Sequence, residues 1–134
     1  MHPKKILLVF FASLVSTSAF SNSTHSCSDQ KDEVQYTLCL KKLRHQSETQ
    51  LQIADQHFQN KIQSWDEDAD YKKAALTAFL KSVDSFNQFL TDECVFESSM
   101  AAGGNGKEAI SSQCHIELIN RRIDYLKAHE YLIH

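Results

Sequence analysis

The fold is indicated first by the stretch YTLCLKKLRHQSETQLQIADQHFQNKIQSW, residues 36–65. Its apolar residues recur at helical spacing with polar residues between them, as on one face of an amphipathic helix. The members of this stripe are Tyr36, Leu40, Leu43, Leu51, Ala54, Phe58, Ile62 and Trp65. The pattern predicts one long helix from about residue 28 to residue 65.

The next segment of the chain is the acidic run DEDAD, residues 66–70, which has no apolar face. Its carboxylates suit the start of a following helix, so we expect a hairpin turn here and a second helix packed antiparallel on the first. A second apolar stripe runs through Ala75, Phe79, Val83, Phe86 and Leu90, and reaches Cys94 and Phe96. We expect the aromatic residues Trp65, Phe79, Phe86 and Phe89 to pack in the core.

The amino-acid composition changes between Ser98 and Ser112, where small residues surround the run MAAGGNG, residues 100–106. Glycine and asparagine favour turns and loops, so we predict a flexible loop in this segment. A third helix is predicted from the stripe Ile110, Cys114, Leu118, Arg122, Tyr125 and Leu126. With three glycines and one proline in the whole chain, the sequence predicts an all-α fold, a small disulfide-stapled bundle of three to four helices.

The N-terminus resembles a secretory signal peptide, with Lys4 and Lys5 before an apolar run from Ile6 to Val15. Small residues allow cleavage after Ala19 or after Ser21, so we assign residues 1–21 to the signal peptide and 22–134 to one domain. This predicts a periplasmic or secreted protein of a Gram-negative-like cell, with no membrane attachment after cleavage. Without the signal peptide, the chain has 12 basic and 17 acidic side chains. This negative net charge disfavours binding to nucleic acid and suits a basic protein partner.

All four cysteines, Cys27, Cys39, Cys94 and Cys114, follow the signal peptide, and an exported chain favours two disulfides. All three pairings are geometrically open. Twelve residues of continuous helix would separate Cys27 from Cys39 by about 18 Å, so a bond between them requires a break in the helix. We favour Cys27 with Cys39 and Cys94 with Cys114, because the second bond would close the glycine loop.

The chain lacks the usual catalytic and metal-binding patterns. No G-x-S-x-G, H-E-x-x-H, P-loop or dinucleotide-binding pattern is present, and the cysteine spacings do not fit zinc. The histidines after the signal peptide show no i, i+4 pairing and are interpreted as surface or tail residues; they are His25, His45, His57, His115, His129 and His134. Paired carboxylates at Asp66 with Asp70, and at Asp92 with Glu93, are interpreted as solvated charges. We therefore expect neither an enzyme, nor a metal site, nor a cofactor.

The segment FNQFLTDECVFE, residues 86–97, resembles the LprI-type lysozyme inhibitor family of secreted bacterial helical domains. The resemblance covers nearly all of the chain after the signal peptide. Its elements are a cysteine pair, an aromatic–aromatic–acid–cysteine segment, a double glycine, and a cysteine followed by leucine and arginine. They correspond here to Cys27 and Cys39, to Phe86, Phe89, Glu93 and Cys94, to Gly103 and Gly104, and to Cys114, Leu118 and Arg122. The sequence departs from the family where Val83, Phe86 and Leu90 replace the usual Gln, Trp and Arg, and where Ile119 replaces Thr.

The resemblance implies inhibition of a peptidoglycan-cleaving muramidase, either a lysozyme or a lysozyme-like toxin that an immunity protein would block. An acidic inhibitor gains association rate with a basic hydrolase through complementary charge. We expect occlusion of the hydrolase by the loop and the nearby acidic residues, namely Glu93, Glu97, Met100, Gly103, Gly104, Asn105 and Gly106. The alternative is a non-catalytic periplasmic structural or envelope-stress module. The sequence leaves a monomer and a homodimer open.

Overall fold

The computed structural model describes residues 27–104 and 106–133, and the expected signal peptide, residues 1–21, lies outside this part of the chain. Three α helices make up most of it: α1 spans Glu33–Ser64, α2 spans Ala69–Ser99 and α3 spans Lys107–His129. A 3-10 turn, η2, follows α3 at Glu130–Leu132. The described residues contain no strand, so the predicted all-α fold is confirmed.

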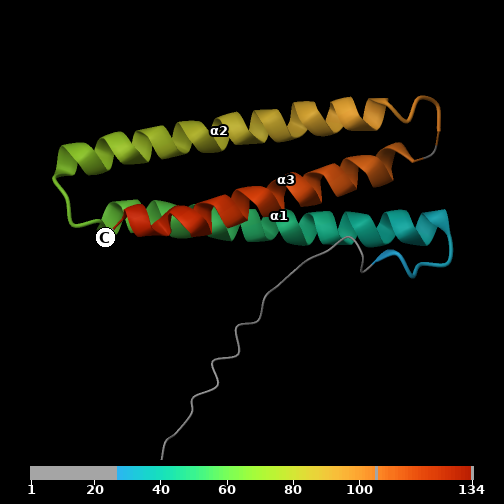
Figure 1. Ribbon diagram of the computed structural model, residues 1–134, viewed down its shortest axis with the longest axis horizontal. Coiled ribbons are helices and arrows are strands. Elements are labelled where there is room, and N and C mark those ends of the chain that lie inside the picture. The colour runs from blue at the N-terminus through green and yellow to red at the C-terminus, as the bar shows by residue number, and fades with distance from the viewer. Residues whose placement is uncertain (1–26, 105, 134) are drawn as a thin grey trace, which may run out of the picture.

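The helices form an up-down-up bundle in which α1 and α3 run parallel and α2 runs antiparallel to both (Figure 1). Helix α3 packs extensively on α1 and on α2, whereas α1 and α2 make the fewest contacts with each other. Helix α2 is antiparallel to α1 and contacts it, as predicted, but α2 packs more extensively on α3 than on α1. The short turn fixes only the direction of α2, and the third helix takes the space between the two.

Helix α1 begins at Glu33, later than the sequence pattern suggested. Asp32 has extended backbone angles and its side chain accepts a hydrogen bond of 2.8 Å from the backbone N–H of Gln35, which caps the first turn. The segment before Asp32 is therefore free to fold back. It brings Cys27 to Cys39, with the two Cα atoms 5.8 Å apart, so the helix break that this disulfide requires is present.

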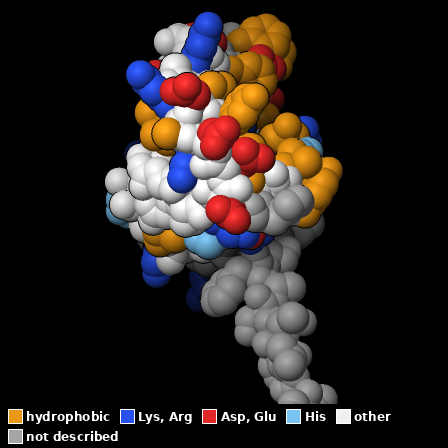
Figure 2. Space-filling view, turned by 90° about the vertical axis from the view of Figure 1, so that its left-hand side faces the viewer, with side chains coloured by type: hydrophobic (Ala, Val, Ile, Leu, Met, Phe, Trp, Pro, Cys, Tyr) orange, Lys and Arg blue, Asp and Glu red, His pale blue; other side chains and the backbone are white. Residues whose placement is uncertain are grey.

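The predicted hairpin turn between the first two helices is confirmed. Helix α1 ends at Ser64, and α2 begins at Ala69 after the run Trp65–Asp68. Figure 2 looks onto this end of the bundle and shows acidic side chains beside hydrophobic ones. None of the helices in the described ranges is long and apolar enough to cross a membrane.

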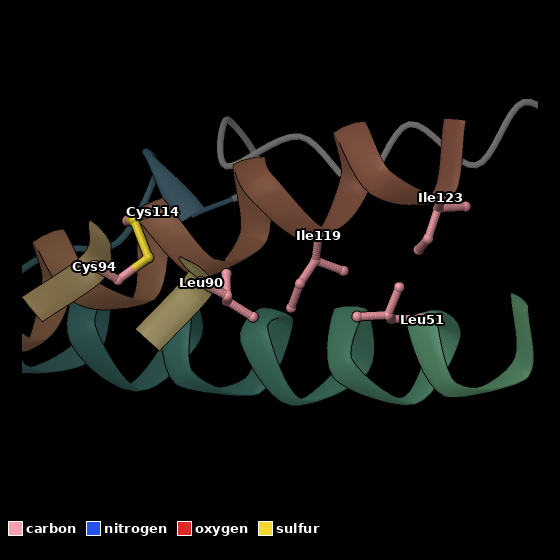
Figure 3. Packing of buried hydrophobic residues seen from close by; sticks show 6 residues of the cluster. All are labelled: Leu51, Leu90, Cys94, Cys114, Ile119 and Ile123. Atoms are coloured by element: carbon pink, nitrogen blue, oxygen red, sulfur yellow. A yellow bond between two sulfur atoms is a disulfide. The ribbon is translucent and has the colours of Figure 1, made fainter. Parts of the chain in front are cut away.

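The core consists of three clusters along the bundle, and each contains residues of α3. The first joins Cys27 and Leu40 to Ala109 and Ile116. The central cluster, shown in Figure 3, contains Leu51, Leu90, Cys94, Cys114, Ile119 and Ile123. The third joins Ile62 of α1 and Phe79 of α2 to Leu126. The bundle is thus held together through α3.

The predicted stripe on α1 is confirmed, because Leu40, Leu51 and Ile62 are buried and its other members are partly buried. The stripe predicted on α3 was incomplete. The buried α3 residues of the three clusters are Ala109, Cys114, Ile116, Ile119, Ile123 and Leu126, and the predicted stripe contained only Cys114 and Leu126 of these. A helix between two neighbours buries more than one face, and a single stripe describes only one of them.

Candidate functional site

The loop between α2 and α3 is shorter than the sequence suggested. Helix α2 continues to Ser99 and α3 begins at Lys107, three residues before Ile110, the first residue of the predicted stripe. The loop starts as tight turns, with the backbone N–H of Ala102 donating to the Ser99 carbonyl at 3.1 Å. Ala102 has a φ of 52°, a left-handed conformation that ends the α2 direction.

Neither Gly103 nor Gly104 has a positive φ, although the double glycine was the feature that suggested a loop. A Cβ atom added at Gly103 would meet nothing within 4 Å. The local backbone and the space around it therefore do not require glycine at this position. The absence of a side chain instead leaves the backbone open to close approach from outside.

An exposed apolar stripe runs along α2 towards this loop. Phe89, Phe96 and Met100 are 49%, 57% and 65% exposed. Their spacing of seven and four residues places them within a narrow sector of the helix. The sequence analysis assigned Phe89 to the core and ended the buried stripe at Phe96, and both assignments were wrong. Apolar residues at helical spacing resemble a core face, and only the arrangement of the helices shows that no neighbour covers this one.

The predicted partner-binding residues lie beside this stripe. Glu93, Glu97 and Met100 follow one another on successive turns of α2, with the two glutamates partly buried and Met100 exposed. Gly103 and Gly104 are exposed and Gly106 is partly exposed, while Asn105 lies outside the described residues. We call this region the loop-end surface, defined by Phe89, Glu93, Phe96, Glu97, Met100, Gly103 and Gly104.

The second disulfide supports this surface from within. Cys94 and Cys114 are bonded, with their Cα atoms 5.5 Å apart, which is the favoured pairing. The bond closes the segment that contains the glycine loop, as expected, and it lies within the two helices rather than at their ends. It joins α2 and α3 about 7 Å below the end of α2, taking 1.5 Å per helical residue. The last turns of α2 are therefore anchored to α3, which holds the loop-end surface in place.

Three of the four paired carboxylates named in the sequence analysis lie at the surface. Asp66, Asp70 and Asp92 are exposed, and Asp92 accepts hydrogen bonds of 2.9 and 3.0 Å from the Gln88 side chain. In the part of the chain that the structure describes, no group of three His, Cys, Asp or Glu residues is arranged to hold a metal ion.

The described histidines have different environments. His45 and His57 are exposed, and His57 lies 3.2 Å from the Glu130 carboxylate. His129 stacks on Tyr125. His115 is partly buried, which differs from the surface position expected for it, while His25 and His134 lie outside the described residues.

One carboxylate, Asp55 of α1, lies in an unfavourable environment. Burial raises the pKa of its side chain, and the positive charge of Arg122 offsets part of this increase. One oxygen of Asp55, Oδ1, is buried without a hydrogen-bond partner, as is Nε of Arg122. Arg122 donates instead to Ser82 Oγ at 3.0 Å and lies over the Phe86 ring.

Replacing Asp55 with asparagine is therefore expected to stabilise the protein at pH 7, by about 2 °C in Tm. The reason is that the folded state disfavours ionised Asp55 relative to the unfolded chain. The cost is present above the raised pKa and disappears below about pH 3.9, where both states are protonated. Thermal unfolding followed by circular dichroism from pH 7 to pH 3 would measure this. The exposed Asp84→Asn on α2 is the matched control, and an equal gain in both variants would contradict the explanation.

The fold and the loop-end surface define a small disulfide-linked helical bundle with an exposed apolar and acidic surface towards one end. The chain belongs to the LprI lysozyme inhibitor family, because the family model described as "Lysozyme inhibitor LprI" matches residues 27–126. The matched range contains both disulfides and most of the three helices, and it confirms the resemblance inferred from the sequence. Searches of curated proteins and of solved structures gave no match.

Proposed function

We propose that this protein inhibits a peptidoglycan-cleaving muramidase by covering it with the loop-end surface. The observation that carries the proposal is the match to the lysozyme inhibitor family over residues 27–126. The proposed target is a basic lysozyme, or a lysozyme-like toxin in which case the protein is an immunity factor. We also propose that residues 1–21 are removed on export, so that the inhibitor acts in the periplasm or outside the cell.

The loop-end surface has the composition of a protein-binding site. Phe96 and Met100 offer large exposed apolar side chains, and aromatic and methionine residues are enriched in interfaces. Glu93 and Glu97 add negative charge beside them, which favours a basic partner. The disulfide between Cys94 and Cys114 holds this part of α2 on α3, so little ordering is needed on binding.

The first experiment is a peptidoglycan lysis assay with a panel of muramidases, with and without a stoichiometric amount of the protein lacking residues 1–21. Dose-dependent protection against one hydrolase would support the proposal and name the target. No protection by folded protein against any muramidase would reject it, and would favour a non-catalytic module that contacts another envelope protein.

The double replacement Phe96→Ala and Met100→Ala is expected to weaken inhibition of that hydrolase by about 10- to 100-fold, as for removal of interface anchors. Both side chains are exposed, so the Tm should change little. Tyr71→Ala is the matched control, because Tyr71 is a 63% exposed aromatic residue at the opposite end of the same helix. Inhibition constants from the lysis assay would show the difference. If Tyr71→Ala weakened inhibition and the double replacement did not, the contact would lie at the turn end of the bundle.

A further inference from the structure

A groove of about 600 Å³ with both polar and apolar lining lies between α1 and α2, with α3 as its floor. It exists because α1 and α2 pack on α3 rather than tightly on each other. Gln52, Asp55 and Gln56 line it from α1, and Asn87 and Thr91 line it from α2. Polar side chains at the inner edges of two neighbouring helices are unusual in a small bundle, where apolar contacts would close the gap.

The groove holds a carboxylate, Asp55, whose positive neighbour Arg122 offsets only part of the cost of burial. None of the ion pairs in the described ranges involves Asp55. Arg44, the cation that lines the groove, is paired with Glu48 at 2.8 Å. Arg122, on α3, donates a hydrogen bond to Ser82 Oγ, and its Nε and the Asp55 Oδ1 are both buried without a hydrogen-bond partner. A half-buried carboxylate in this position gains most from a cation that comes from outside.

The floor of the groove adds a second hydrogen-bond acceptor. His115 Nδ1 lies 2.7 Å from the Ser111 carbonyl, and because a carbonyl only accepts, Nδ1 carries the proton. Burial lowers the pKa of His115, so the ring is held neutral and its Nε2 is an acceptor. Asp55 and His115 Nε2 both accept hydrogen bonds, so a bound group that donates hydrogen bonds would fit them. A guanidinium group supplies five donors and one positive charge.

We propose that this groove binds a cationic side chain, an arginine, presented by the partner hydrolase and paired with Asp55. The identity of the partner rests on the proposed function, whereas the groove and its preference for a cation rest on the structure. The contact would be separate from the loop-end surface and would add specificity for a hydrolase with an arginine at the matching position.

The probe is argininamide, added to isotope-labelled protein lacking residues 1–21 and followed by NMR. We expect saturable shifts of the side-chain amides of Gln52, Gln56 and Asn87. Asp55→Asn, which should fold stably, is expected to weaken binding at least tenfold, and Asp84→Asn on the outer side of α2 should not. Citrullinamide, which is similar in shape but uncharged, should not bind. Unchanged binding by Asp55→Asn, or shifts confined to the acidic turn at residues 66–70, would overturn the proposal.

The pH dependence gives an independent readout. The charged or titratable groups at the groove are Arg44, Glu48 and Asp55 on α1, and His115 and Arg122 on α3, while α2 contributes only uncharged residues to it. Binding should weaken as the pH falls through the raised pKa of Asp55, because a protonated carboxyl cannot pair with a cation. Asp55→Asn should lack this acid loss. The same loss in both proteins would place the effect elsewhere and reject the role of Asp55.

The outcomes of the two proposals can be separated. Protection in the lysis assay without argininamide binding would leave the proposed function standing and reject the groove. Argininamide binding without inhibition of any hydrolase would support the cation site and reject the hydrolase as its source. Binding of N-acetylglucosamine oligomers in place of argininamide would make the groove a glycan site and overturn the proposal.

Discussion

Replacement of both Cys94 and Cys114 by alanine should lower the free energy of unfolding by about 3 kcal/mol or more. The bond closes a segment with a sequence separation of 20 residues. For a loop of this length, the lost restriction of the unfolded chain alone accounts for about 3 kcal/mol. The two cysteines are also 0% and 4% exposed and belong to the central cluster, so their removal also costs packing.

The matched control is the double alanine replacement of Cys27 and Cys39. Its sequence separation is 12, so the entropic effect is similar in size. However, this bond attaches only the short segment before α1, which can detach while the three helices stay packed. We therefore expect a smaller loss, about 1 to 2 kcal/mol, because detachment returns chain entropy to the folded state.

Urea unfolding would give the two free energies, and amide hydrogen exchange would locate the effect. Without the Cys94–Cys114 bond, the last turns of α2 should exchange faster, together with the loop-end surface. Inhibition of the target hydrolase should weaken as well, because the contact residues would need to be ordered on binding. A larger stability loss from the Cys27–Cys39 pair would contradict the view that α2 depends on its bond to α3.

The three helices could be predicted from the sequence, and the observed disulfide pairing was the one favoured among three open alternatives. Leu40, Leu51 and Ile62 repeat at helical spacing, and the acidic run at residues 66–70 separates two such patterns. Glycine and proline are scarce enough to leave few places for other turns. These signals are local, since each depends on residues within a few positions of one another. Local signals define helices well, but they do not say which helix faces which.

The arrangement of the helices therefore could not be predicted from the sequence. Ile116, Ile119 and Ile123 face α1 because α3 lies in the middle, and no pattern within α3 states that position. For the same reason, Phe89 and Phe96 resembled core residues although no helix covers them. Of the candidate site, Glu93, Glu97, Met100 and the glycines were predicted from the resemblance. The adjoining aromatic residues and the groove at Asp55 became visible only in the structure.

The central place of α3 leads to the second large effect, a loss of about 3 to 4 kcal/mol of unfolding free energy on replacing Ile119 with alanine. Ile119 is fully buried in the central cluster, between Leu51 of α1 and Leu90 of α2 (Figure 3). Because α1 and α2 make few contacts of their own, they cannot close around the space that the side chain leaves. The cavity therefore persists, and the loss of unfolding free energy exceeds the free energy of transferring the removed atoms from water to the core.

Ile53→Ala provides the control, since it removes the same atoms from a side chain of α1 that is 64% exposed. It should change the free energy of unfolding by less than about 0.5 kcal/mol. Urea denaturation of both variants would measure the contrast. Ile119→Thr introduces the residue that the family usually has at this position. Its loss of unfolding free energy should lie between those of Ile53→Ala and Ile119→Ala, because threonine keeps more volume than alanine but buries a hydroxyl. Equal small losses at Ile119 and Ile53 would mean that α1 and α2 can collapse onto each other, and that α3 is not what holds the bundle together.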